Sequence, residues 1–204
     1  MASRLVLLVE EPSMEAFLKT LLPRMLPDGP EFDIRVFGGK ADLLGKLDQR
    51  LRAYQRWLPS DWRLVVIVDR DNDDCQELKA QLEVSATNAG LRTRSQTGTS
   101  AWQLVNRVVI EELEAWYFGD WDAVRAAYPR VNPGIPRRSG YRDPDDIRGG
   151  TWEAFERILK RSGYFTTGLR KIEAAQAVAA HISVDRNRSR SFAHFWNAIS
   201  EAAA

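Results

Sequence analysis

The chain has 204 residues, 44% of them hydrophobic, and a formal net charge of +1 at pH 7. This length fits one domain, or one domain with a helical extension, and the composition can form a sizeable core. The single cysteine, Cys75, excludes an intrachain disulfide and a cysteine-based zinc site. No run approaches the ~20 apolar residues of a transmembrane helix, and the apolar run at 5–9 is too short for a signal peptide, so we expect a cytoplasmic protein.

The first half of the chain alternates short apolar runs with segments of helical spacing. The run at 64–68 is apolar throughout, which is typical of a strand buried on both faces of a parallel sheet. The run at 32–37 alternates apolar and polar residues and predicts a more exposed strand. The other expected strands are 4–9, 104–110 and a weak one at 91–95; the expected helices are 12–22, 40–57 and 73–88.

The second half is predicted to be mostly helical, beginning with helical spacing around 113–117. The segment 129–150 is rich in proline, glycine and arginine and predicts a long loop. Helices are expected at 151–162, 168–182 and 191–202. The sequence therefore predicts an α/β fold, with a central, mainly parallel sheet flanked by helices and a helical C-terminal part. Its predicted parts are an α/β core at 1–128, a basic loop at 129–150, and helices packed on the core at 151–204.

Acidic residues follow two of the predicted strands. Glu10 and Glu11 come directly after 4–9, and Asp69, Asp71 and Asp73 follow 64–68. The carboxyl ends of parallel strands share one edge of a sheet, where ligands usually bind, so these carboxylates are expected to converge. Hard oxygen ligands at this spacing suit Mg²⁺ or Mn²⁺. The alternative is that 71–74 is a solvated turn that caps the next helix.

Three architectures place acids in this way. A phosphoacceptor receiver domain has paired acids after its first strand and an aspartate after its third, but it also needs a lysine on a late strand. A haloacid-dehalogenase-like phosphatase uses D-x-D after its first strand, whereas Asp69-Arg70-Asp71 follows the third. The TOPRIM fold of primases, topoisomerases and overcoming-lysogeny-type nucleases places a glutamate after the first strand and D-x-D after a later one.

Four segments, in this order along the chain, resemble a TOPRIM-like bacterial family of uncharacterised proteins. The segment 9–18, V-E-E-P-S-M-E-A-F-L, resembles the opening V-E-G-x-T-E-x-x-F-L, and 69–71 resembles the D-x-D motif. The segment 113–120, L-E-A-W-Y-F-G-D, resembles E-x-E-A-W-x-x-x-D. The segment 190–195, R-S-F-A-H-F, resembles the closing S-F-x-x-F. The resemblance spans nearly the whole chain.

The resemblance implies a metal-dependent nuclease that hydrolyses phosphodiester bonds in DNA or RNA. It makes Glu10 the general acid/base or a metal ligand, and Asp69 and Asp71 the residues that hold Mg²⁺ or Mn²⁺, with Asp73 as a further ligand. Glu11 stands where the family pattern has glycine, so its side chain could crowd the metal site or add a ligand. The acids that could lie behind the metal ligands are Glu11, Glu15 and Glu114; for the latter two, a helix-surface role is the alternative.

Basic residues are concentrated between 130 and 190, which would let a polyanion approach a nearly neutral protein. The alternative is a set of scattered, solvated arginines. Some relatives act as nuclease effectors beside a defence ATPase, so phage defence and an ATPase partner are expected, and no membrane. The alternatives are a catalytically degenerate binding or regulatory subunit of such a complex and a receiver-like phosphoacceptor. The residues expected to contact nucleic acid are Arg137, Arg138, Arg142, Arg148 and Lys171.

Overall fold

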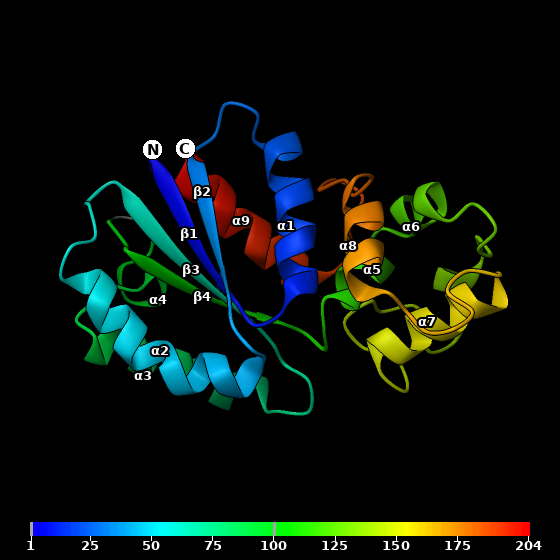
Figure 1. Cartoon of the computed structure of the whole chain (residues 1–204), viewed down its shortest axis with the longest axis horizontal. Coiled ribbons are helices and arrows are strands. Elements are labelled where there is room, and N and C mark those ends of the chain that lie inside the picture. Colours follow the sequence, from blue (N-terminus) through cyan, green and yellow to red (C-terminus); the bar gives the residue numbers. More distant parts are fainter. Residues whose placement is uncertain (1, 100) are drawn as a thin grey trace.

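The computed structural model describes residues 2–99 and 101–204. At its centre is a four-stranded, all-parallel sheet in the order β2-β1-β3-β4 (Figure 1). The strands are β1 (Arg4–Val9), β2 (Glu31–Val36), β3 (Trp62–Asp69) and β4 (Leu104–Val109). The structure thus confirms the expected α/β fold with a central parallel sheet.

Burial along the strands follows their places in the sheet. The residues of β3 from Leu64 to Asp69 are all buried, because the strand is covered on both faces and paired on both sides. In contrast, β2 pairs only with β1 and is half exposed, as its alternating sequence predicts. The sheet therefore has a protected centre and an open edge at β2.

Two layers of helices sandwich the sheet (Figure 1). On one face lie α1 (Pro12–Met25) and α9 (Arg190–Ala203), and on the other α2 (Lys40–Gln55) and α3 (Cys75–Asn88). Alternate residues of β1 point to the two layers: Leu5 and Leu7 pack in the α1/α9 core, and Val6 and Leu8 pack in the α2/α3 core. Each face of the sheet thus has its own apolar core.

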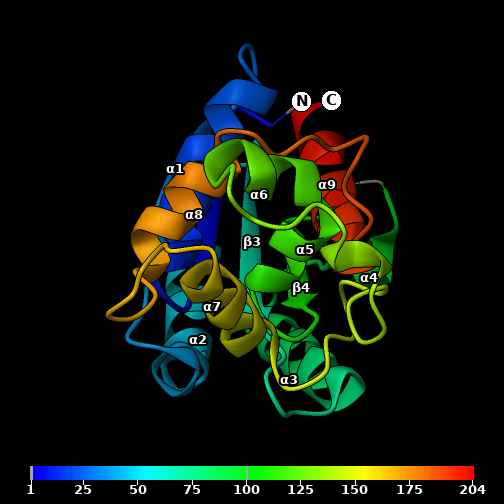
Figure 2. The same cartoon turned by 90° about the vertical axis from the view of Figure 1, so that its right-hand side faces the viewer.

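Four further helices gather beyond the carboxyl ends of the strands, as Figures 1 and 2 show. They are α5 (Glu114–Gly119), α6 (Trp121–Ala127), α7 (Thr151–Arg161) and α8 (Lys171–Ala179). Apolar residues of these helices, such as Trp116 and Phe155, belong to the same core as α1 and α9. The helical C-terminal part is therefore joined to the sheet layer by one continuous core, and it covers the edge where the acids emerge.

The segment 129–150 has little regular structure but is firmly attached. It contains only a short 3₁₀ helix, η1 (Ile135–Arg137). Ile135 and Ile147 are buried in the main core. The carboxylate of Asp145 accepts hydrogen bonds from the hydroxyl of Ser189 (2.7 Å) and the backbone N–H of Arg190 (2.6 Å), at the start of α9. The segment is thus held in place by apolar anchors and by a carboxylate at a helix N-terminus.

One expected element is wrong. Instead of a strand at 91–95, the chain has a short helix, α4 (Arg94–Thr97), and an isolated bridge at Thr93. Thr93 and Gln96 form a capping box at the start of α4. The chain therefore turns into a helix at Thr93 and does not continue as a strand. Within the part of the chain that the structure describes, no helix combines the length and apolar character needed to cross a bilayer.

Candidate functional site

Glu10 and Asp69 form a buried carboxyl pair at the carboxyl edge of the sheet. Glu10 directly follows β1, Asp69 is the last residue of β3, and the two strands are neighbours. The backbone N–H of Asp69 donates to Oε1 of Glu10 (3.1 Å). Glu10 is 7% exposed and Asp69 is 5% exposed. The parallel sheet therefore brings these two acids together, across 59 positions of sequence.

The environment makes the two carboxyl groups reluctant to ionise. Burial raises the pKa of Glu10 to about 7, although its hydrogen bonds with Asp69 counteract part of this rise. Burial, together with the negative charge of Glu10, raises the pKa of Asp69 well above its usual value. Oε2 of Glu10 and Oδ1 of Asp69 are buried without a hydrogen-bond partner. The pair thus holds a proton near neutral pH and has two oxygens with unused acceptor capacity.

A third acid, Glu114, lies near the pair at the start of α5. It is 2% exposed, and its Oε2 also lacks a partner. Burial raises the pKa of Glu114 to about 7. The hydroxyl of Tyr117 is buried and unpartnered as well, and its pKa is raised by burial and then by the charges of Glu114, Glu11 and Asp69. We call Glu10, Asp69 and Glu114 the inner acids.

Lys171, the first residue of α8, supplies positive charge to the inner acids. Burial alone would lower the pKa of Lys171, but the attraction of Glu114, Glu11 and other nearby acids raises it. Its Nζ lies 3.7 Å from Oε1 of Glu11. The residue expected to contact phosphate therefore lies at the candidate site, far along the chain from the acids that it faces.

Asp71 and Asp73 belong to a separate, more exposed cluster. Nζ of Lys40, at the start of α2, donates to Oδ2 of Asp71 (2.9 Å), to Oδ2 of Asp73 (2.8 Å) and to the backbone oxygen of Arg70 (2.8 Å). Lys40 thus holds the loop that follows β3 and offsets part of the negative charge of its acids. Asp74 is the N-cap of α3, so the capping interpretation holds for this residue.

The loops after β3 and β4 are tied to each other beside the site. Arg70 forms an ion pair with Glu111, and the N–H of Asp71 donates to the backbone oxygen of Glu111 (3.0 Å). Asp71 and Glu111 both have positive φ, 49° and 61°. Backbone strain of this kind is found preferentially at functional sites. The local geometry therefore supports a site at this edge of the sheet.

The inner acids fit a hard divalent cation by their chemistry. Glu10, Asp69 and Glu114 each present a buried carboxylate oxygen without a partner, and Mg²⁺ and Mn²⁺ prefer such ligands. Within residues 2–99 and 101–204, however, no three His, Cys, Asp or Glu side chains stand in an arrangement ready to hold a metal. Asp71 could join the inner acids only by leaving Lys40. The site can thus supply metal ligands, but a full set requires side chains to move.

The remaining predicted site residues lie further out. Glu15 forms a surface ion pair with Lys19 (2.7 Å), one helical turn along α1. Of the basic residues in 129–150, Arg137 lines a hollow of about 300 Å³ together with Arg186 and Arg188. Arg148 lies three residues before α7, whose first residue, Thr151, donates its hydroxyl to Glu112 (2.8 Å). The four arginines of this segment that are expected to contact nucleic acid, Arg137, Arg138, Arg142 and Arg148, are all exposed, as is Arg130.

Sequence reasoning missed Lys40, Glu112 and Tyr117. Lys40 follows Gly38-Gly39 after β2, and the φ of 99° at Gly39 is one that favours glycine. A lysine after a glycine pair at the end of a parallel strand was therefore a usable signal. Glu112 accepts from the N-terminus of α7 through Thr151 and Trp152. Tyr117 gave no signal, because its spacing is that of an ordinary core residue.

Comparison with known proteins gives one family. The family model described as "Domain of unknown function (DUF4276)" matches residues 9–200, so the chain belongs to this family. The match includes Glu10, Asp69, Asp71, Glu114 and Lys171. No curated protein and no solved structure matches the chain.

The raised pKa of Glu114 predicts a specific dependence of stability on pH. Its pKa is about 7 in the folded chain against 4.5 ordinarily, so the folded state binds more protons between these values and stability falls as pH rises through this window. We expect Glu114→Gln, which cannot ionise, to gain stability relative to the wild type from pH 4.5 to pH 8. A change of one pKa unit corresponds to 1.36 kcal/mol, so the relative gain is on the order of 2–3 kcal/mol.

Chemical denaturation at several pH values, without divalent metal, measures this difference. Glu15→Gln is the matched control, because Glu15 is a partly exposed surface acid, and its stability difference from the wild type should change little with pH. Parallel pH profiles for wild type and Glu114→Gln would contradict the prediction.

Proposed function

We propose that this member of the DUF4276 family is a metal-dependent, TOPRIM-like nuclease that hydrolyses phosphodiester bonds in DNA or RNA. The observation that carries the proposal is the buried Glu10–Asp69 pair with its unpartnered oxygens, at the edge where parallel strands end. A structural acid in this position would be expected to have its oxygens satisfied by hydrogen bonds. Unsatisfied, proton-holding carboxyls of this kind are typical of sites that bind or react.

Hydrolysis of a phosphodiester requires a water molecule to lose a proton as its oxygen attacks phosphorus and the P–O bond to the leaving oxygen breaks. With a pKa of about 7, Glu10 can accept that proton near neutral pH. Lys171 would attract the phosphate, because its raised pKa keeps it charged among the acids. The hydrogen bond from the N–H of Asp69 holds the carboxylate of Glu10 in a fixed orientation.

The residues that would hold a metal are Glu10, Asp69 and Glu114, with Asp71 joining on release from Lys40. When bound, Mg²⁺ or Mn²⁺ would neutralise the charge of the scissile phosphate and lower the pKa of water. The metal would also relieve the repulsion among the inner acids. Without it, that repulsion is reduced by the shared proton and by Lys171.

A second candidate function is a catalytically degenerate binding or regulatory subunit of an ATPase complex, as in phage defence. It is favoured by two lysines at the site. Lys40 holds Asp71 and Asp73. Lys171 lies beside Glu11, the residue that stands where the TOPRIM-like pattern has glycine. In this case the lysines would replace a metal permanently. A receiver-like phosphoacceptor at Asp69 remains a third interpretation, and labelling of Asp69 by acetyl phosphate would indicate it.

The proposal predicts that purified protein cleaves nucleic acid only with Mg²⁺ or Mn²⁺ present. Glu10→Gln keeps the size of the side chain but removes its capacity to take a proton, so we expect activity to fall by about 10²–10⁴-fold. Glu15→Gln should keep wild-type activity, because Glu15 only pairs with Lys19 on the surface. Cleavage of labelled single- and double-stranded DNA and RNA, with and without the protein encoded beside it, provides the measurement. Equal activity of Glu10→Gln and wild type would refute the assignment.

Metal binding can be tested separately from cleavage. We expect Asp69→Asn and Asp71→Asn each to weaken the binding of Mn²⁺ by at least about tenfold, because each removes an anionic ligand. Lys40→Gln should strengthen binding, because it frees Asp71 from its ion pair. Asp122→Asn, which changes an exposed acid of α6, is the control. Calorimetric titration with Mn²⁺ measures all four variants, and unchanged affinity in both aspartate variants would favour the degenerate subunit.

The predicted role of the arginines of segment 129–150 in binding nucleic acid has its own test. Arg137→Ala/Arg138→Ala should weaken binding of an oligonucleotide and reduce its dependence on salt, by a slope of about 0.9 per lost phosphate contact on duplex DNA or about 0.7 on single strands. Arg52→Ala/Arg56→Ala, at the exposed C-terminal end of α2, removes the same charge elsewhere. Anisotropy of a labelled oligonucleotide at several salt concentrations compares them. Identical slopes would assign these arginines to solubility or to docking on a partner protein.

A further inference from the structure

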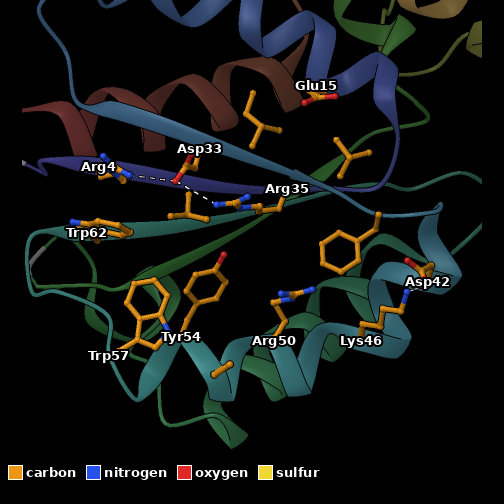
Figure 3. A pocket seen from close by; sticks show the side chains of 15 residues that line it. Arg4, Glu15, Asp33, Arg35, Asp42, Lys46, Arg50, Tyr54, Trp57 and Trp62 are labelled. Atoms are coloured by element: carbon orange, nitrogen blue, oxygen red, sulfur yellow. Dashed lines mark hydrogen bonds and ion pairs between the residues drawn. The ribbon is translucent and has the colours of Figure 1, made fainter.

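The outer edge of β2 is an open strand edge beside a groove. β2 pairs only with β1, over six consecutive residues in uninterrupted register, and contains no proline. The groove has a volume of about 830 Å³ and is lined by β2 and α2 (Figure 3). Trp57, which lines its wall, is 55% exposed. Natural proteins protect open edges with proline, bulges, charged side chains or a covering segment; β2 has no proline and no break in its register, and its only such device is its charged residues, Glu31, Asp33 and Arg35.

The backbone of β2 leaves three residues free to pair. The N–H of Glu31 donates to Ser3 (3.1 Å) and the N–H of Phe37 donates to Val9 (2.9 Å), so odd-numbered residues face β1. By the alternation of a strand, the N–H and C=O groups of Phe32, Ile34 and Val36 face away from the sheet. No described residue supplies a hydrogen bond to these outward groups.

The charges on β2 are complementary to a second, antiparallel copy of itself. The outward N–H and C=O groups of two β2 strands can pair only if the even-numbered residues of one copy lie opposite even-numbered residues of the other. Among the central registers of this kind, one places Asp33 opposite Asp33 and another places Arg35 opposite Arg35, and like charges opposite each other are unfavourable. The register centred on Ile34 instead places Asp33 opposite Arg35, twice, at the close non-hydrogen-bonded positions. It also places Phe32 opposite Val36, so that apolar residues share one face.

We propose that the chain forms a two-fold symmetric homodimer by antiparallel pairing of β2 with β2, in the register centred on Ile34, giving one continuous eight-stranded sheet. Six backbone hydrogen bonds would join Phe32, Ile34 and Val36 of the two copies. Asp33 is accessible for this pairing, since its side chain is 38% exposed. Its present partners are Arg4 (3.4 Å) and Arg35 of the same strand (3.6 Å), as Figure 3 shows. The groove then lies along the dimer seam. This inference does not depend on the proposed nuclease function.

Two opposite charge changes and their mixture test the register. Arg35→Asp alone places Asp opposite Asp, and Asp33→Arg alone places Arg opposite Arg, so each is expected to weaken the dimer by at least about tenfold. In a mixture of the two variants, both positions of a mixed pair become complementary again. We therefore expect the mixture to regain the wild-type dimer affinity. Analytical ultracentrifugation of each protein over a wide range of concentration measures the mass.

The mixture also controls for folding, because only folded chains can restore the dimer. Arg52→Asp makes the same charge change on an exposed residue of α2 outside the groove, and its dimer should match the wild type. Hydrogen exchange should show protection of the amides of Phe32, Ile34 and Val36 in the dimer and its loss in Arg35→Asp. A wild type with the mass of one chain at all concentrations would overturn the proposal. This outcome would also be expected if the edge of β2 binds a different protein. A dimer unaffected by either variant, or a mixture that stays monomeric, would overturn it as well.

Discussion

The burial of several carboxyl groups at one edge of the sheet constrains the rest of the structure. Glu10, Asp69 and Glu114 are nearly inaccessible to water, where negative charge is costly without compensation. Compensation comes from a proton shared between Glu10 and Asp69 and from Lys171. Lys171 reaches the acids because α8 packs against α1, the helix that begins directly after Glu10 and Glu11. The helical C-terminal part thus completes the electrostatics of the sheet edge as well as covering it.

Two lysines divide the acids into groups with different chemistry. The inner acids have raised pKa values and oxygens without a hydrogen-bond partner, whereas Asp71 and Asp73 are exposed and both pair with Lys40. A cation entering the inner group would take over the role of the shared proton, and its affinity would therefore rise with pH as the carboxyls ionise. Recruiting Asp71 would additionally break its contact with Lys40. Under the proposed function, this competition between lysine and metal would separate an active enzyme from a degenerate subunit.

The sequence predicted those features of the site that depend on strand order and spacing. The apolar run at 64–68 and its following acids were enough to place Asp69 beside Glu10, because parallel strands end at one edge. The orientation of Asp71 could not be predicted, since it depends on a positive φ and on Lys40, which lies 31 positions away in the sequence. The burial of Glu114 depends on how α5 packs against α7 and α9. The false strand at 91–95 failed because the capping box of Thr93 and Gln96 is a local signal stronger than a weak apolar pattern.

The open edge and the acid cluster are connected through β2. The strand's outer groups face the edge, and its carboxyl end continues through Phe37 and Gly39, whose N–H groups donate to Val9 and Glu10 (both 2.9 Å). Lys40 follows at once and holds Asp71. A partner that orders β2 would therefore also order the loop that positions Lys40 and the backbone of Glu10. Because the loop carries Lys40, which pairs with Asp71, a change in its position would alter how readily Asp71 could join a metal under the proposed function. Pairing at the edge of β2 and ligand binding at the inner acids would then be linked through the few residues from Val36 to Lys40. This link would require no rearrangement of the core.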